Sequence, residues 1–388
     1  MEFQLTEAQR LIQETARRLA KERIAPRAAE LDETGEYPHD IFEAFQEVGL
    51  LGLTLPEEYG GSGVGTLPLA LAVEEAAKYC CASGLILLLS ALSTHPILIG
   101  GTEEQKKSWL SRSAAGEIKG AFCLTEPNSG SDASALESRA VLDGDDYVLT
   151  GEKVFISGGT VADYVVAFAR TDGKQGPKGI AGFIVPTNSP GFSVARTDRK
   201  MGVRGVPTAN IVFDSVRLPK DMLIGGEEER GFNQAMLTLN TCRPVVGARG
   251  VGLAEGAMTY ALDYARQREA FGKPIAELQA IQFMFADMAI QIEAARLLVY
   301  QGAWRVDQGK YQREDAALLS IAKTFATEMA VKVSSDALQV MGAQGYMMDH
   351  PLERHYRDAR QLMIVEGTSE IQRLVISRAM LAGNLSYA

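Results

Sequence analysis

Closely spaced runs of strand-forming residues in the middle of the chain constrain its fold most. Between residue 121 and about residue 230, β-branched and aromatic residues alternate with turn-forming residues, as at 147–149, 153–156, 164–168, 182–185 and 210–213. This composition is typical of short strands. Parallel strands need crossover connections of a dozen or more residues, and the gaps leave no room for crossover helices. The sequence therefore predicts a compact antiparallel barrel or sandwich.

Helical patterns flank this segment on both sides. Apolar residues recur at three- and four-residue steps, which indicates one buried face of a helix. The stripes are Leu5, Ala8, Ile12, Ala16, Leu19 and Ala20; Ile281, Met284, Met288, Ile292, Ala295 and Val299; and Leu318, Ile321, Phe325 and Met329. Long amphipathic helices usually pack as antiparallel bundles.

Together these patterns predict an α+β fold that is mostly α, in three parts. A chain of 388 residues is too long for a single core. We expect an N-terminal α-helical domain (1–120), a central antiparallel β-barrel or sandwich (121–230) and a C-terminal four-helix bundle (231–388).

Charge and composition argue against several classes of protein. The formal net charge of −10 disfavours nucleic acid or an anionic membrane as the main partner, because both require a basic surface. The four histidines are scattered without metal-ligand spacing, so we expect no metal site. Four cysteines without a C-x-x-C pair fit a reducing cytoplasm.

We also expect no targeting or membrane segment. The first residues lack the basic and apolar regions of a signal peptide, and they are not rich in arginine. The most apolar stretch, residues 84–92, is too short to span a bilayer.

The segment 364–373 contains the strongest candidate for a catalytic residue. It places Glu366 between apolar Val365 and Gly367. Apolar neighbours can raise the pKa of a carboxylic acid toward neutrality, which suits a general base. Ser369 and Gln372 then fit the capping box of a helix that starts here. The alternative is that Glu366 is a solvated loop acid near a helix N-terminus, where the dipole favours it.

No dinucleotide-binding fingerprint is present. The glycines of 250–256 are one residue out of the G-x-G-x-x-G spacing and lie in a helical pattern, so they predict close helix packing instead. The loop 125–132, which follows a strand, is rich in hydroxyls, turn formers and glycine. Its donors suit a pyrophosphate or the carbonyl edge of a flavin, and an ordinary turn is the alternative.

Five segments of the chain are informative together: 121–132, 268–273, 339–345, 353–360 and 364–373. In this order they resemble the acyl-CoA dehydrogenases, flavoenzymes that desaturate acyl thioesters. The resemblance covers nearly the whole chain. It implies the same helix–barrel–bundle architecture, FAD as cofactor, an acyl-CoA substrate and Glu366 as the base that removes the α-proton while a hydride goes to the flavin.

The resemblance also implies the residues that bind the two ligands. The FAD-binding positions correspond to Phe122, Leu124, Thr125, Gly130, Ser131, Phe155, Ile156, Ser157, Arg268, Phe271, Gln279, Gln339, Val340, Gly342, Ala343, Thr368, Ser369 and Glu370, partly contributed by a neighbouring subunit. The acyl-CoA positions correspond to Ser131, Asn240, Arg243 and Gly367. Many relatives have Trp and Thr at the positions of Phe155 and Ser157, and both changes keep an aromatic wall and a hydroxyl.

Two positions bear on the substrate and the base. Val365 stands where many straight-chain enzymes have tyrosine, which favours a branched, cyclic or otherwise unusual acyl group. Some relatives carry the catalytic acid at the position of Cys242, and the cysteine there leaves Glu366 as the base. The run 353–360 most resembles the short-chain, butyryl-type members.

The family further implies an electron-transferring flavoprotein as electron acceptor, a homotetramer and a role in fatty acid metabolism. Three alternatives remain open from the sequence. The chain could be a flavin oxidase or monooxygenase on the same scaffold, a dehydrogenase for substrates linked to acyl carrier protein, or a non-catalytic nucleic-acid-binding member, which the negative charge disfavours.

Overall fold

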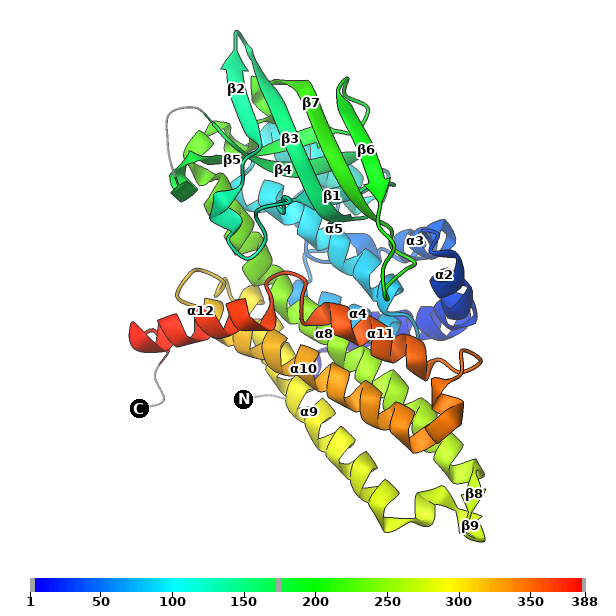
Figure 1. The fold of residues 1–388 in the computed structure, drawn as a ribbon. Helices are drawn as coiled ribbons and strands as arrows, with labels where there is room; N and C mark the ends of the chain where they lie inside the picture. Colours follow the sequence, from blue (N-terminus) through cyan, green and yellow to red (C-terminus); the bar gives the residue numbers. More distant parts are fainter. Residues whose placement is uncertain (1–3, 172–175, 386–388) are drawn as a thin grey trace.

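A computed structural model describes residues 4–171 and 176–385 of the chain. Residues 1–3, which begin the N-terminal segment where we expect no signal peptide, lie outside this range. Figure 1 shows a sheet at one end of the molecule and a bundle of long helices extending away from it. The expected mostly helical fold, with helices before and after a central sheet, is confirmed.

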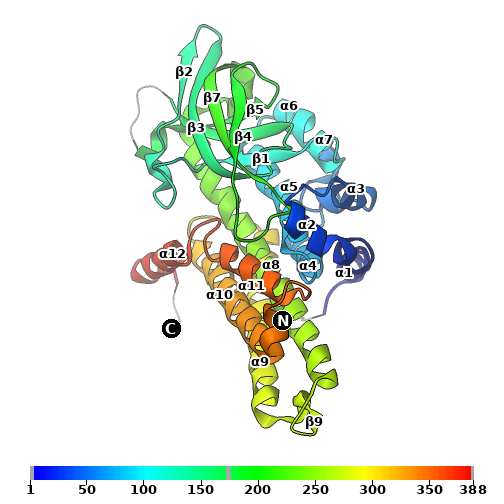
Figure 2. The same cartoon turned by 45° about the vertical axis from the view of Figure 1, so that its right-hand side comes forward.

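Short helices and one long helix precede the sheet. Thr6 caps the first of them, because its side chain accepts from the Gln9 amide and the Gln9 side chain accepts from the Thr6 amide. Figure 2 shows α1 to α4 beside the bundle and α5 beneath the sheet. The helices are α1 (Glu7–Leu19), α2 (Ala28–Thr34), α3 (His39–Glu47), α4 (Thr66–Ala77), α5 (Cys81–Gly100), α6 (Glu103–Gln105) and α7 (Ser111–Ala114).

Helix α5 is longer than its most apolar stretch suggested. Its 20 residues are apolar enough to cross a membrane by length and composition alone. However, 83% of its most apolar window is buried inside the protein, so it is the kind of helix found in a protein core. It packs against β1, α4 and α8.

The seven-stranded sheet has the order β1-β4-β2-β3-β7-β6, and β5 pairs with the other edge of β4. Its strands are β1 (Gly120–Cys123), β2 (Arg139–Asp143), β3 (Asp146–Ser157), β4 (Tyr164–Arg170), β5 (Ile180–Pro186), β6 (Phe192–Thr197) and β7 (Thr208–Pro219). The sheet is not purely antiparallel as predicted, since β4 runs parallel to β1 and to the end of β2. The β2–β3 hairpin provides the crossover between β1 and β4, so no helix is needed there.

The C-terminal helices are α8 (Gly231–Gln267), α9 (Gln279–Asp307), α10 (Ala316–Met341), α11 (Leu352–Leu362) and α12 (Ser369–Leu381), with a small hairpin of β8 (Glu269–Ala270) and β9 (Lys273–Pro274) after α8. Helices α8, α9 and α10 pack along one another, and α11 and α12 lie across α10. The predicted close packing at the α8 glycines is confirmed. A Cβ on Gly252 or Gly256 would lie 2.0 Å from a backbone oxygen of the α4 segment.

Candidate active site

An open cleft lies where the sheet meets α5, α8 and the segment between α11 and α12. Its empty volume, mouth included, is about 1500 Å³. The cleft brings together Glu366, Gly367 and Thr368 with Arg243 of α8 and with all of the flavin-binding positions predicted in the central β segment. Those positions are Phe122, Leu124, Thr125, Gly130, Ser131, Phe155, Ile156 and Ser157. Residues that are more than 240 positions apart in the chain thus form one site.

An aromatic side chain and a hydroxyl-rich loop form the sheet side of the cleft. Phe155 is 66% exposed and has a left-handed φ of 61°, which is rare for an aromatic residue. Such exposure and backbone conformation in a cleft point to a ligand that covers the ring. Thr125 and Ser157 place hydroxyls on the same wall, so the wall offers both a stacking surface and hydrogen-bond donors.

A buried ion pair anchors the loop that starts at Thr125. The Lys153 ammonium is completely buried and lies 2.6 Å from Glu126 Oε1, and it also donates to the Leu124 carbonyl. Glu126 accepts from the amides of Glu137 and Ser138 as well. Burial opposes ionisation of Glu126, but Lys153 and these amides outweigh it, and the pKa of Glu126 is lowered. The charged pair therefore fixes both ends of the loop.

Glu366 combines a strained backbone with a buried carboxyl oxygen. Its φ is 53° and that of Gly367 is 94°, so two successive residues are left-handed. The Glu366 Oε2 atom is buried and has no hydrogen-bond partner among residues 4–171 and 176–385. Burial raises the pKa of Glu366 to about 7, against the opposing effects of Arg249, Lys323 and Arg243. A carboxyl that titrates near neutrality is suited to accept a proton.

Not all of the residues predicted to bind coenzyme A line the cleft. Arg243 and Ser131 line the cleft, whereas Asn240 lies behind Arg243. The Asn240 side chain accepts from Arg243 Nη1 at 2.7 Å and donates to the Tyr311 carbonyl at 2.9 Å. Burial lowers the pKa of Arg243 to about 10, so the guanidinium stays charged at neutral pH. Asn240 thus orients the cation that faces the cleft.

The remaining flavin-binding positions do not line the cleft. Arg268 and Phe271 lie at the β8–β9 hairpin, at the end of the bundle far from the sheet (Figure 1), and Phe271 is 91% exposed. Gln279 starts α9 beside this hairpin, and Gln339, Val340, Gly342 and Ala343 lie at the end of α10. A single chain does not bring these residues to its own cleft.

The start of α12 differs by one residue from the predicted capping box. Thr368, not Ser369, is the N-cap, and its hydroxyl accepts from the Ile371 amide. Ser369 is the first helical residue and is buried, while Glu370 is exposed in the first turn. The Gln372 side chain instead donates to the carbonyls of Glu366 and Gly367.

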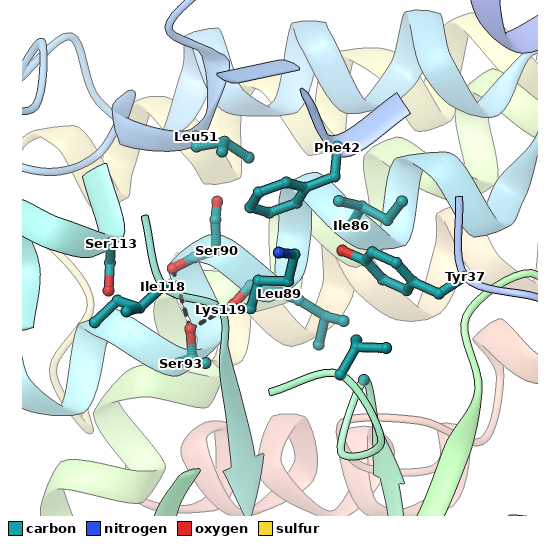
Figure 3. Close-up of a pocket in the computed structure, with 13 residues that line it drawn as sticks. Tyr37, Phe42, Leu51, Ile86, Leu89, Ser90, Ser93, Ser113, Ile118 and Lys119 are labelled. Atoms are coloured by element: carbon teal, nitrogen blue, oxygen red, sulfur yellow. Dashed lines mark hydrogen bonds between the residues drawn. The ribbon is translucent and has the colours of Figure 1, made fainter. Parts of the chain in front are cut away.

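A second, smaller pocket adjoins the cleft, since Leu89 lines both. The Lys119 ammonium lies over the ring of Phe42, 4.3 Å from the ring centroid. Figure 3 shows both side chains in this pocket, with Tyr37 and the hydroxyls of Ser90 and Ser93 nearby. None of the predicted site residues lines this pocket. The candidate site is therefore the larger cleft alone.

Family models match the chain in three consecutive parts: the acyl-CoA dehydrogenase N-terminal domain over residues 6–117, the middle domain over 121–216 and the C-terminal domain over 229–381. The chain belongs to the acyl-CoA dehydrogenase family. Members of this family are FAD-dependent oxidoreductases, and the predicted family, enzyme class and cofactor are confirmed.

Individual relatives are similar over nearly their full length. A probable acyl-CoA dehydrogenase YngJ of Bacillus subtilis is 44% identical over 98% of this chain and 100% of its own. The cyclohexane-1-carbonyl-CoA dehydrogenase of Geobacter metallireducens is 42% identical over 98% of this chain and 99% of its own. Butyryl-CoA dehydrogenase from Megasphaera elsdenii is 39% identical in sequence, and its structure matches with a TM-score of 0.95 over 98% of this chain and 100% of its own.

The cleft also contains residues that sequence patterns did not single out. Arg249 is completely buried and lines the cleft, and its Nε and Nη1 atoms have no hydrogen-bond partner in the described part of the chain. Gln361 also lines it and accepts from Arg249 Nη2 at 3.2 Å. Arg249 follows Gly247 in a run of small residues, and a lone arginine in such a run is a signal that could have been noticed.

Proposed function

We propose that Glu366 is the general base of this acyl-CoA dehydrogenase. The observation that carries the proposal is its carboxyl in the cleft, with one buried oxygen that lacks a partner and a pKa raised to about 7 by burial. A carboxylate at that position can take the α-proton of a thioester at neutral pH. Its own backbone N–H, which donates to no acceptor in the described chain, is available to the thioester oxygen.

The sheet side of the cleft fits FAD. An exposed aromatic ring, two hydroxyls and a glycine-containing loop provide a stacking wall and donors, and Phe155, Thr125 and Ser157 would hold the ring. When bound, the flavin supplies the acceptor for the β-hydrogen as hydride. Arg243, buried and charged, would hold an anionic part of coenzyme A, and the apolar walls keep water from the carboxylate.

The acyl group we propose is short and branched or cyclic. Val365 lines the cleft in place of a bulky aromatic, and Leu85, Leu89 and Leu92 form an uncharged wall on α5. A relative named for a cyclohexane-1-carbonyl substrate supports a ring, and a neighbour named for butyryl supports a short chain.

We further propose a homotetramer that passes electrons to an electron-transferring flavoprotein in fatty acid metabolism in the cytoplasm. Support for assembly comes from α9, where Phe283, Ile290, Leu297 and Trp304 recur every seven residues and are 48–67% exposed. Such a stripe favours burial against a second copy. Four buried free cysteines fit a reducing compartment.

Replacing the base tests the proposal. Glu366→Gln should lower kcat at least ~10²-fold, because general-base catalysis contributes roughly 10²–10⁴-fold, while the protein stays yellow. The measurement is anaerobic bleaching of the flavin by butyryl-, isobutyryl-, isovaleryl- and cyclohexanecarboxyl-CoA. Wild-type rates in the variant would exclude Glu366 as the base. A wild-type protein bleached by none of them would favour a carrier-protein substrate or the oxidase alternative.

A further inference from the structure

The backbone of the Glu366 loop is held from outside by two side chains. Glu366 and Gly367 both have left-handed backbone conformations. This conformation costs energy at the glutamate and persists only when the surrounding structure fixes it. The Gln372 amide donates to both carbonyl oxygens at 3.1 Å. The Lys323 ammonium donates to the Gly367 carbonyl at 2.9 Å from α10. The position of the Glu366 carboxyl therefore depends on a lysine that lies on a different helix.

Lys323 is an unusual residue for the interior of a helix bundle. It is completely buried, and the Gly367 carbonyl is its only hydrogen-bond acceptor in the described part of the chain. Burial lowers its pKa to about 8, and Glu366 is the foremost of the charges that oppose this, ahead of Glu328 and Glu370. Arg373 already binds both oxygens of Glu328, at 2.5 and 2.8 Å. Glu366 is thus the carboxylate whose charge most favours the ionised form of this buried amine.

The charges that face Glu366 come from two helices. Arg249 and Arg243 approach it from α8 and Lys323 from α10, and all three favour its ionised form. The neutral thiol of Cys242 on α8 faces it as well. Of these groups, only Lys323 also bonds to the backbone of the loop. Lys323 therefore acts on the proposed base in two ways: through a hydrogen bond to its loop and through its charge.

We propose that Lys323 is a positioning residue for Glu366. Its ammonium clamps the Gly367 carbonyl, and its charge favours the ionised form of the Glu366 carboxyl. The inference rests on the proposed role of Glu366 as base. It assigns no contact between Lys323 and either ligand, because Lys323 does not line the cleft.

Two substitutions separate the clamp from the charge. Lys323→Met removes both, whereas Lys323→Gln keeps an N–H donor for Gly367 and removes only the charge. In the wild type we expect kcat to fall on the acidic side with a midpoint near pH 7. In both variants this midpoint should shift to higher pH by about one pH unit. Lys323→Met should also lose about tenfold or more in kcat at the pH optimum, with KM changed less than about threefold. Lys332→Met is the matched control, since Lys332 lies on α10 and pairs with Asp336 on the surface.

A merely structural role for Lys323 would lower stability without moving the pH profile. If the acidic midpoint of the kcat–pH profile is unchanged in a folded, FAD-containing Lys323→Gln protein, the proposal is overturned. The Lys323→Gln variant alone decides the question if Lys323→Met fails to fold. Thermal unfolding of Lys323→Met, Glu366→Gln and the double variant gives an independent readout. Lys323→Met should cost less stability in the Glu366→Gln background than in the wild type, because the lysine then has no buried carboxylate to offset; an equal cost in the two backgrounds would contradict the coupling between the two groups.

The same series distinguishes this inference from the assignment of the base. If Glu366→Gln retains wild-type turnover, the proposed base itself is wrong, whatever the Lys323 variants do. If Glu366→Gln is inactive while the acidic midpoint of Lys323→Gln stays at the wild-type pH, only the positioning role fails.

Discussion

Glu366 combines features that each cost stability: a left-handed backbone, a buried oxygen without a partner and a carboxyl that resists ionisation. Strain of this kind persists where the surrounding structure fixes it and is concentrated at functional sites. Here the surroundings are Gln372 and Lys323, which bind the carbonyls of the same short segment. The chain thus holds the carboxyl of the proposed base in place through its backbone and leaves its buried oxygen without a partner in the described part of the chain.

The raised pKa of Glu366 makes stability depend on pH in a definite direction. Because the pKa in the folded protein is about 7 and the ordinary value is 4.5, the stabilising contribution is full below pH 4.5 and is lost as pH rises through 7. Glu366→Gln should therefore gain stability relative to wild type between pH 5 and 8, by on the order of 2 kcal/mol. Urea unfolding at both pH values measures this gain.

Glu370 provides the control of opposite sign for that experiment. It lies in the first turn of α12, and hydrogen bonds to the backbone and to Thr368 lower its pKa. Glu370→Gln should lose stability relative to wild type as pH rises from acidic to neutral values. A Glu366→Gln protein that behaves like Glu370→Gln would contradict a buried, proton-retaining Glu366.

Sequence analysis identified the carboxyl and one of the cations around it, Arg243, but not Lys323 or Arg249. Apolar neighbours, a glycine and a helix start made Glu366 a candidate, and the resemblance to the acyl-CoA dehydrogenases singled it out. Lys323 and Arg249 interrupt apolar or small-residue runs, and a pattern based on hydropathy assigns such residues to solvent. Both are fully buried, since each has a polar partner that the sequence does not reveal: a loop carbonyl for Lys323 and the Gln361 amide for Arg249.

At the scale of elements, α10 shows why a predicted buried stripe was only partly right. Met329 is buried, but Phe325 is 41% exposed. The face that packs against α8 carries small residues, Ala322, Ala326 and Ala330, because α8 presents Gly250, where a Cβ would lie 2.8 Å from the Ala326 carbonyl. Two helices this close exclude large side chains from their contact, so the larger apolar residues face outward.

The loop after β1 depends on the ion pair between Lys153 on β3 and Glu126. Lys153→Met should destabilise the protein by roughly 3–5 kcal/mol, because it leaves a carboxylate buried without its cation. The loop lines the cleft, so FAD should also dissociate more readily from this variant, as measured by flavin release on dilution or dialysis.

The matched control for Lys153→Met is Lys220→Met in the same domain. Lys220 pairs with Asp145 at 2.9 Å, but both side chains are at least half exposed. Surface ion pairs contribute about 0–1 kcal/mol to the free energy of unfolding. Lys220→Met should therefore change neither stability nor flavin retention by much. Equal effects of the two substitutions would show that burial does not distinguish the pairs.

At the scale of the whole molecule, the residues that we propose to bind flavin lie at two distant places. The cleft holds the residues of the sheet, and the far end of the bundle carries Arg268, Phe271 and the end of α10, with Phe271 and Tyr346 exposed at 91% and 74%. One copy cannot join them. A second copy that packs on the α9 stripe offers a way to bring one chain's bundle end to the other's cleft.

Assembly and flavin binding should therefore be lost together. Ile290→Glu with Leu297→Glu places two carboxylates in the exposed stripe of α9 and should dissociate the oligomer, because desolvating charges in an apolar interface is costly. Light scattering with size exclusion measures the mass, and visible absorbance measures flavin per chain. Leu11→Glu, at an isolated leucine that is 64% exposed on α1, should change neither. Because the bundle end lies far from the cleft of its own chain, a monomer that keeps a full complement of FAD would contradict a shared site.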